Sequence, residues 1–245
     1  MGASKTVAVD DVDFAIRQGS ICGLAGASGS GKSTLARCLA GLEAPTRGHV
    51  LFRGDGISDL SRADRLQFHH RVQLVLQDAS NALNPRFTAA RAIAEPLAVA
   101  GMGTAASRRS QALYWIETLG LEDAAADRPV LEFSGGQRQR LTIARALIGN
   151  PEFVIFDESF SALDMPLRAQ ILDLLSALRA KQDCGYLVIS HDLSLLARTC
   201  DEIAVMHRGR IVEIARPAEL LSNPVHEYSR KLVQAIPGLP PEACA

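Results

Sequence analysis

A glycine-rich loop near the amino terminus determines much of the architecture that this chain can adopt. The loop follows a short apolar run, 21–25, and leads into an amphipathic stretch. Glycines let several backbone N–H groups converge on phosphate oxygens, and the start of a helix favours negative charge at that point. We therefore predict a strand, a phosphate-binding loop and a helix. The predicted loop consists of Gly26, Ala27, Ser28, Gly29, Ser30, Gly31, Lys32, Ser33 and Thr34.

Two side chains of this loop carry its chemistry. Lys32 supplies a positive charge to the β- and γ-phosphates, and Ser33 can offer its hydroxyl to Mg²⁺. The alternative is an ordinary Gly/Ser-rich turn, but such a turn has no need for a Lys-Ser pair at the start of a helix. The motif alone indicates a P-loop nucleoside triphosphatase, a class that includes kinases, GTPases and helicases.

Short apolar runs that alternate with helical patterns predict the rest of the fold. The alternation is typical of an α/β domain with a largely parallel sheet, and the predicted strands are 21–25, 72–76, 153–156, 186–189 and 203–206. Periodic apolar residues between 88 and 129 indicate a helical insert. At the two ends we predict antiparallel strands at 7–9 and 14–16, a hairpin after Gly48, a strand at 210–214 and two short helices reaching Ala235.

Two adjacent carboxylates end the apolar run 153–156. Successive strand residues point to opposite faces, so we assign Asp157 and Glu158 different roles. Asp157 is suited to the shell of a Mg²⁺ ion, and Glu158 to polarising the attacking water as general base. The alternative, a strand that merely ends in solvated acids, explains less when a phosphate loop belongs to the same sheet.

Two further polar side chains follow predicted strands. His191 comes directly after the run 186–190, and Gln77 after 72–76. Each of them alone is typical of an ordinary surface or loop residue. Ligands of open α/β sheets bind at the carboxyl ends of the strands, so we predict that His191 positions the γ-phosphate. Gln77 is predicted to touch both the attacking water and Mg²⁺, which makes Ser33, Gln77 and Asp157 the predicted metal site.

A second helix start of the anion-binding type lies in the middle of the chain. A serine hydroxyl and bare glycine N–H groups precede an amphipathic helix there, at Ser134, Gly135, Gly136 and Gln137. This segment resembles the signature motif of the ABC ATPase family. The segment directly after the acid pair, Ser161, Ala162, Leu163 and Asp164, resembles the D-loop of the same family.

The resemblance covers nearly the whole chain, with five motifs in the family's order. It implies a P-loop ABC ATPase fold with a mostly parallel core sheet, an antiparallel β subdomain and a helical signature subdomain. It also implies ATP and Mg²⁺ as cofactors. In the family, two subunits meet head to tail, and each ATP lies between the phosphate loop of one and the signature of the other. We expect a nucleotide-binding domain at 1–222, with its helical insert at about 88–145, and a carboxyl-terminal extension at 223–245.

Two stretches further resemble the peptide and nickel importer branch of the family, in its shorter, second-ATPase form. They run from Gln77 through Asn84-Pro85-Arg86 to Leu97, and from Asn223 through His226-Glu227-Tyr228 to Pro237. This resemblance implies an importer of peptides, nickel or a metal chelate. It further implies a second ATPase (a paralogue or another copy of this chain), two membrane permease subunits that dock on 87–101, and indirectly an extracytoplasmic binding protein.

One family feature has no counterpart here. The family stacks adenine on an aromatic side chain in an upstream strand, whereas no aromatic residue precedes Val7. Two explanations are open: the chain starts late and lacks that strand, or weaker apolar contact from Val7 holds the base. An ABC ATPase of a non-transport system and a P-loop kinase or GTPase are the alternative functions, but the former carries long coiled-coil or fused domains and the latter leaves Ser134–Gln137 unexplained.

Composition limits the surroundings in which the chain works. Lysine and arginine total 26 against 27 aspartates and glutamates, with no basic run, so we expect no nucleic-acid partner. The Ala-rich stretch 88–106 contains Arg91, Glu95 and Pro96 and falls short of the about 20 apolar residues of a spanning helix. The amino terminus has no long apolar segment typical of secretion. With the resemblance, this predicts a peripheral protein on the cytoplasmic face of the plasma (inner) membrane.

Overall fold

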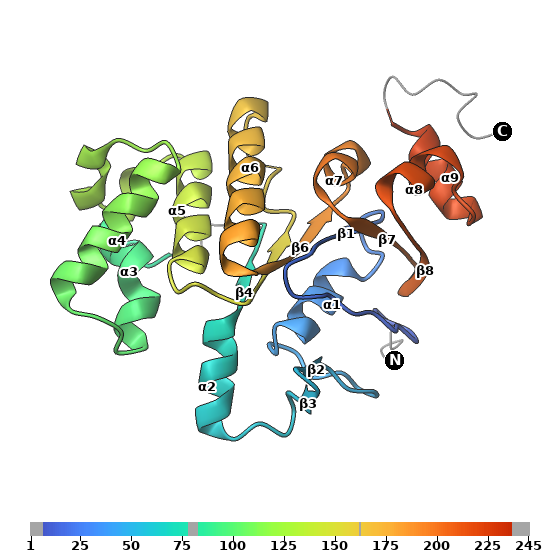
Figure 1. Cartoon of the computed structure of the whole chain (residues 1–245), viewed down its shortest axis with the longest axis horizontal. Coiled ribbons are helices and arrows are strands. Elements are labelled where there is room, and N and C mark those ends of the chain that lie inside the picture. Colours follow the sequence, from blue (N-terminus) through green and yellow to red (C-terminus); the bar gives the residue numbers. More distant parts are fainter. Residues whose placement is uncertain (1–6, 78–82, 162, 237–245) are drawn as a thin grey trace, which may run out of the picture.

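The computed structural model of the chain describes residues 7–77, 83–161 and 163–236 (Figure 1). Its central sheet contains β1 (Ile21–Ala25), β4 (Val72–Val75), β5 (Phe153–Asp157), β6 (Gly185–Ser190), β7 (Glu202–His207) and β8 (Arg210–Ala215). The strand order is β4-β5-β6-β1-β7-β8. All neighbours pair in parallel except β7 and β8, which are antiparallel. The predicted strands and the mostly parallel sheet are therefore confirmed.

Helices cover both faces of this sheet. They are α1 (Lys32–Leu39), α2 (Arg62–Arg71), α3 (Ala89–Val99), α4 (Ala105–Thr118), α5 (Gly135–Leu147), α6 (Met165–Gln182), α7 (Leu193–Thr199), α8 (Pro217–Ser222) and α9 (Glu227–Gln234). Short 3₁₀ turns occupy Asp123–Asp127 and Val130–Glu132. Several helices begin where a polar side chain accepts from the backbone of the first turn, as Ser134 does for α5 and Asp164 for α6.

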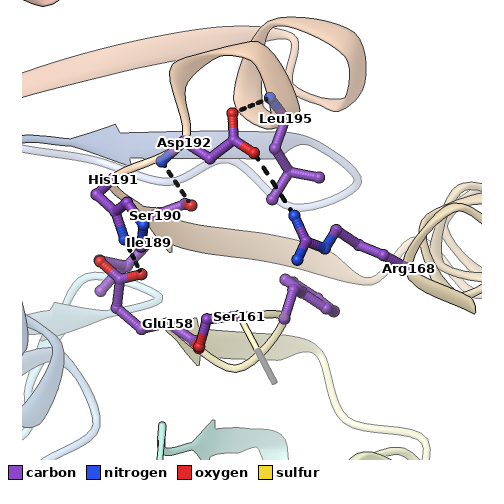
Figure 2. A pocket seen from close by; sticks show the side chains of 9 residues that line it. Glu158, Ser161, Arg168, Ile189, Ser190, His191, Asp192 and Leu195 are labelled. Atoms are coloured by element: carbon purple, nitrogen blue, oxygen red, sulfur yellow. Dashed lines mark hydrogen bonds and ion pairs between the residues drawn. The ribbon is translucent and has the colours of Figure 1, made fainter. Parts of the chain in front are cut away.

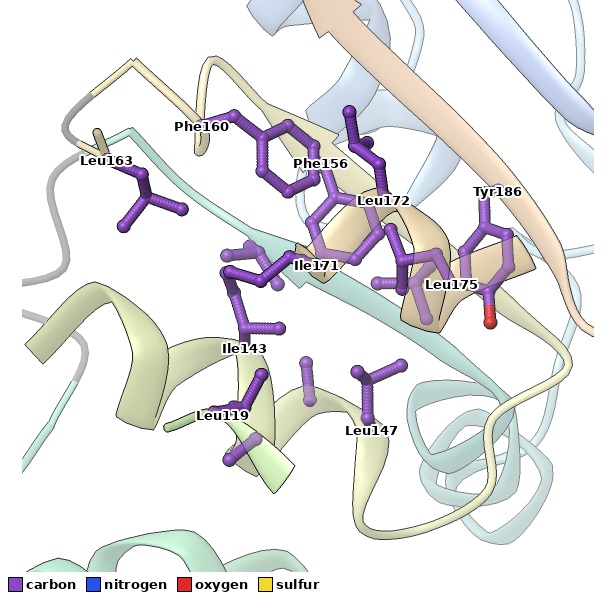
Figure 3. Packing of buried hydrophobic residues seen from close by; sticks show 14 of the residues in the cluster. Leu119, Ile143, Leu147, Phe156, Phe160, Leu163, Ile171, Leu172, Leu175 and Tyr186 are labelled. Atoms are coloured by element: carbon purple, nitrogen blue, oxygen red, sulfur yellow. The ribbon is translucent and has the colours of Figure 1, made fainter. Parts of the chain in front are cut away.

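The strands read as continuous apolar runs because helices bury them on both sides. Every residue of β1 and of β6 is buried. On one face of the sheet, aromatic and branched side chains pack against the helices. Figure 3 shows this packing for Phe156 and Tyr186, which lie against Leu175 of α6. A second, smaller cluster includes Leu35 of α1 and Met206 of β7. The site described below therefore rests on a rigid, closely packed support.

The predicted antiparallel strands at 7–9 and 14–16 are wrong, because the structure assigns no strand to these residues. Asp11 has a left-handed backbone with φ of 51°, which interrupts a ladder. The backbone N–H of Asp10 donates to the carbonyl of Gly209 at 2.8 Å instead of to a neighbouring strand. The predicted hairpin after Gly48 is confirmed as β2 (Leu51–Phe52) and β3 (Asp55–Gly56), which form the antiparallel sheet.

The helical insert and the carboxyl-terminal helices lie at opposite ends of the molecule (Figure 1). In the insert, α3 packs against α4 and α5. At the other end, α8 and α9 confirm the two predicted short helices, and Val233 of α9 is buried in the core. The boundary between domain and extension at residue 222 stays a prediction. Within the described ranges, none of the helices combines the length and the apolar character needed to cross a membrane.

Candidate functional site

The predicted site residues lie at one edge of the sheet, at the carboxyl ends of the four adjacent strands β4, β5, β6 and β1. The register pairs Asp157 with Ile189, and Ala25 with Ser190. The next residue after each of these strands lies at the same edge of the sheet, because the strands are parallel and end level with one another. These residues are Glu158 after β5, His191 after β6 and Gly26 after β1. Gln77 is exposed two residues beyond Val75, which pairs with Phe156, so it leaves β4 beside the acid pair.

The phosphate loop joins β1 to α1 as predicted. Gly31 precedes α1 with φ of 108°, and a Cβ atom there would collide with the carbonyl oxygen of Ala8. Only glycine fits both conditions. No side chain caps α1, so the N–H groups of its first turn remain available to an anion.

Lys32 lies inside this loop, with 6% of the residue exposed. Its Nζ donates to the carbonyl oxygens of Gly26 at 2.7 Å and Ala27 at 3.0 Å. Burial lowers the pKa of the Lys32 ammonium, although the carboxylates of Glu158 and Asp157 oppose this shift. The positive charge is thus held inside the loop by two of the loop's own carbonyl oxygens.

Asp157 is buried at the end of β5, with 4% of the residue exposed, and its Oδ1 has no hydrogen-bond partner. Burial raises the pKa of its carboxyl group, and the nearby Ser33 hydroxyl acts in the opposite direction. A buried, unpartnered carboxylate oxygen beside a serine hydroxyl is the donor set that Mg²⁺ uses when substrate phosphates complete its shell. The residues present therefore fit a Mg²⁺ ion.

Glu158 and His191 form a pair across the ends of β5 and β6. Oε2 of Glu158 lies 2.8 Å from Nδ1 of His191, and Figure 2 shows the carboxylate pointing at the imidazole ring. Glu158 has φ of 50°, an unusual value for a side chain other than glycine, and its backbone N–H donates to the carbonyl of Ile189 at 3.1 Å. Strained backbone of this kind is common at active sites. Both side chains line a cavity of about 100 Å³.

The Ser134–Gln137 segment starts α5 with a capping box. The Ser134 hydroxyl accepts from the backbone N–H of Gln137 at 3.3 Å, and the Gln137 side chain accepts from the N–H of Ser134 at 2.9 Å. Gly135 and Gly136 carry the remaining N–H groups of this first turn. Throughout the described part of the chain, no hydrogen bond or ion pair joins this segment to the phosphate loop. Within the described residues, the two predicted anion sites thus share no hydrogen bond or ion pair.

The predicted D-loop runs from the acid pair to the start of α6. The Ser161 hydroxyl donates to the carbonyl of Glu158 at 2.8 Å, and Leu163 is buried. The Asp164 side chain accepts from the N–H of Leu167 at 2.9 Å and caps α6. Ala162 lies outside the described residues, as does Asp78 in the stretch after Gln77.

A groove on the helical insert lies away from this edge. Its volume is about 560 Å³, and it is lined by residues of α3 and α4 and the turn before α3, including Phe87, Ala94, Ala98 and Arg108. Arg91 places its guanidinium over the Phe87 ring, 3.9 Å from the centroid. Part of the segment predicted to meet a permease thus forms an open, partly apolar depression.

With this geometry established, comparison with known proteins decides the family. The model of the ABC transporter family matches residues 9–161, which contain the phosphate loop, the signature segment and the acid pair. The chain belongs to the ABC transporter family. The predicted recognition and fold class are thereby confirmed.

Two of the similar proteins within the ABC family are named as oligopeptide transport ATP-binding proteins. The oligopeptide transport ATP-binding protein OppF of Bacillus subtilis (strain 168) is 44% identical over 94% of this chain and 76% of its own length. A putative oligopeptide transport ATP-binding protein of the same organism, YkfD, is 42% identical over 98% of this chain and 74% of its own length. These proteins match the predicted branch of the family.

Solved ABC cassettes share the whole architecture. A dimeric post-hydrolysis structure of the ATP-binding cassette MJ0796 with ADP and Pi superposes with a TM-score of 0.81. It is 29% identical and covers 89% of this chain and 94% of its own. The similarity therefore extends over most of this chain and nearly all of that ABC cassette.

Two contacts of this ABC cassette escaped the sequence analysis. The Tyr228 hydroxyl accepts from the N–H of Ala27 in the phosphate loop at 2.9 Å. Glu213 of β8 accepts from the N–H groups of Val225 and His226 at 2.9 and 3.0 Å. No local pattern signals these contacts, because Tyr228 is separated from Ala27 by 201 residues and Glu213 from Val225 and His226 by 12 and 13 residues.

Proposed function

We propose that this chain hydrolyses ATP as the motor subunit of an ABC importer for peptides. The observation that carries the proposal is the shared sheet edge, where a buried Lys32 in the phosphate loop meets Asp157 and the Glu158–His191 pair. Family membership supports the hydrolytic activity, and the oligopeptide transport relatives support the cargo class.

In this proposal, the phosphate loop holds the triphosphate. The N–H groups at the start of α1 bind the β- and γ-phosphates, and Lys32 turns from the carbonyls of Gly26 and Ala27 toward them. Ser33 and Asp157 would hold Mg²⁺, with Gln77 beside them. When bound, the ion neutralises the charge that develops on the transferred phosphoryl group.

Glu158 accepts the proton of the attacking water. Its carboxylate is largely shielded, with 15% of the side chain exposed, and His191 orients it through the 2.8 Å contact. His191 is itself open, with 69% of the side chain exposed, so it can turn toward a γ-phosphate at the mouth of the site. Glu158 thus acts as the catalytic base and His191 positions it and the phosphate.

A second ATPase completes each site in this proposal. Among the described residues, none accepts from the N–H groups of Gly135 and Gly136, and Ser134 adds its hydroxyl, so the segment suits the γ-phosphate held by a facing subunit. The D-loop residues Ser161, Leu163 and Asp164 line the same seam. The facing subunit is a paralogous ATPase or a second copy of this chain.

The chain works beneath two permease subunits at the cytoplasmic face of the plasma (inner) membrane. In this proposal the groove between α3 and α4 receives a permease segment, and Gln77 links that contact to the site. Residues 1–222 form the nucleotide-binding domain and 223–245 its extension. An extracytoplasmic binding protein delivers the cargo and does not touch this chain.

Uptake of a labelled oligopeptide by cells tests the proposed cargo. Cells that lack this chain should take up little peptide, and a plasmid carrying the wild-type chain should restore uptake. Uptake of nickel or a nickel chelate, measured in parallel, should not depend on the chain. Nickel uptake that depends on the chain, with unchanged peptide uptake, would assign it to the other cargo of this branch.

Filling the groove should separate ATP hydrolysis from transport. Ala98→Trp places a large ring in the groove, where Ala98 is exposed on α3, so docking of a permease segment should fail while the catalytic edge is untouched. We expect peptide uptake to fall at least about tenfold, as expected for a hot-spot contact, with unchanged ATP binding by the isolated chain. Gln111→Trp, an exposed position of α4 outside the groove, is the control. Wild-type uptake by Ala98→Trp would exclude this groove as the docking site.

A further inference from the structure

The carboxyl-terminal helix reaches the phosphate loop through one side chain. The hydroxyl of Tyr228, in the first turn of α9, accepts from the backbone N–H of Ala27 at 2.9 Å. The Tyr228 ring also stacks on His207 at the end of β7, with centroids 3.9 Å apart and planes 24° from parallel. The ring is thereby fixed between the sheet and the loop.

Hydrogen bonds to Glu213 and His226 fix the start of α9, the helix that carries Tyr228. Glu213 anchors the chain before α9 by accepting from Val225 and His226, and the His226 ring accepts from the N–H of Tyr228 at 3.1 Å. Burial opposes ionisation of Glu213, but the Ser229 hydroxyl and the N–H groups of Val225 and His226 hold its pKa below the ordinary value. The start of α9 therefore sits on the sheet as a charged, hydrogen-bonded unit at neutral pH.

The contact restrains Ala27 from both sides. The carbonyl of Ala27 accepts from Lys32 Nζ at 3.0 Å and from the N–H of Ser30 at 3.2 Å, while its N–H donates to Tyr228. The N–H and the carbonyl of Ala27 belong to the two successive peptide groups on either side of its Cα, so these contacts restrain both peptide groups at the point where Lys32 is held. A group that fixes Ala27 therefore pre-organises the loop before a phosphate arrives.

We propose that Tyr228 is a positioning residue of the nucleotide site and that the start of α9 acts as a brace for the phosphate loop. The inference rests on the proposed function, because it assigns a role toward the triphosphate that residues 26–34 hold. Tyr228 touches the loop and not the reacting atoms. Losing one such hydrogen bond weakens nucleotide binding by about three- to tenfold.

Thermodynamic reciprocity gives the proposal a second consequence. If the docked α9 favours the binding-competent loop, then bound nucleotide must favour the docked α9 by the same factor. Backbone amides of Glu227–Gln234 should therefore exchange with deuterium more slowly when ATP is present. Because any ligand of the native state slows exchange through global unfolding, the discriminating result is that ATP slows exchange in α9 less in Tyr228→Phe than in the wild-type chain.

The test compares Tyr228→Phe with Tyr114→Phe in the full chain. Tyr228→Phe removes the hydroxyl and keeps the ring on His207, whereas Tyr114 is an exposed tyrosine of α4 with 58% of the residue accessible. We expect the Kd for ATP to rise about three- to tenfold in Tyr228→Phe and to stay at the wild-type value in the control. In turnover assays KM should rise by the same factor with kcat changed by less than about twofold.

Glu213→Ala provides a second route to the same result, because it releases the anchor of α9 without touching Tyr228 or the loop. It should weaken ATP binding by at least as much as Tyr228→Phe. A wild-type Kd in Tyr228→Phe, or exchange in α9 that ignores ATP in the wild-type chain, would overturn the inference. A wild-type chain that does not bind ATP at all would instead overturn the proposed function.

Discussion

Glu158→Gln should lower ATP turnover by about 10²–10⁴-fold, the usual contribution of a positioned general base. Glutamine keeps the size of the side chain and cannot accept the proton of the attacking water. ATP binding should stay near the wild-type value, because in our proposal the loop and Lys32, and not Glu158, contact the phosphates. Since bound triphosphate holds the two subunits together in our proposal, the variant should accumulate as a closed dimer with ATP.

The measurement is ATP turnover together with size-exclusion chromatography in the presence of ATP. Glu219→Gln is a matched control, since it makes the same carboxylate-to-amide change at an exposed position of α8. We expect wild-type turnover and no trapped dimer for the control. Hydrolysis near the wild-type rate in Glu158→Gln would remove Glu158 as the base.

Lys32→Ala should weaken ATP binding itself by about 10- to 100-fold, the cost of losing charge-assisted hydrogen bonds to phosphate. The fold should tolerate this change. Lys32 is a buried cation with a lowered pKa, and replacing it removes the cost of burying that charge. Because the substitution also removes the donor to the carbonyls of Gly26 and Ala27, we expect a melting temperature without nucleotide close to that of the wild-type chain.

Titration with ATP, by calorimetry or a fluorescent analogue, measures this effect. Lys181→Ala, at an exposed lysine in the last turn of α6, controls for the loss of one positive charge. It should bind ATP like the wild-type chain. Tight ATP binding by Lys32→Ala would contradict the placement of the phosphates in the loop Gly26–Thr34.

Much of the fold and the site could be predicted because their signals are local. The apolar runs that became β1, β5 and β6 are continuous since both faces of the sheet are buried, and a chemical motif follows each run directly. If the strands are parallel, their carboxyl ends share one edge of the sheet. The phosphate loop, the acid pair and His191 must then lie at that edge. No knowledge of side-chain contacts is needed for that step.

The features that escaped prediction depend on partners far apart in the sequence. We predicted strands at 7–9 and 14–16, but the backbone of Asp10 pairs with Gly209, and the Asp10 carboxylate with Arg210, 2.7 Å away. These contacts tie the amino-terminal segment to the β7–β8 turn in place of a ladder. The capping box at Ser134 and Gln137, in contrast, has a local pattern and could have been predicted.

The central claim is that each catalytic site becomes complete only when two subunits close around ATP. ATP turnover per chain, measured over a dilution series for the wild-type chain and for Ser134→Arg, tests it most directly. We expect turnover per wild-type chain to rise with the concentration of this chain, or of the second ATPase when that subunit is supplied. Ser134→Arg should bind ATP normally but hydrolyse it at least about 100-fold more slowly. Equal turnover at every dilution, unaffected by Ser134→Arg, would contradict the claim.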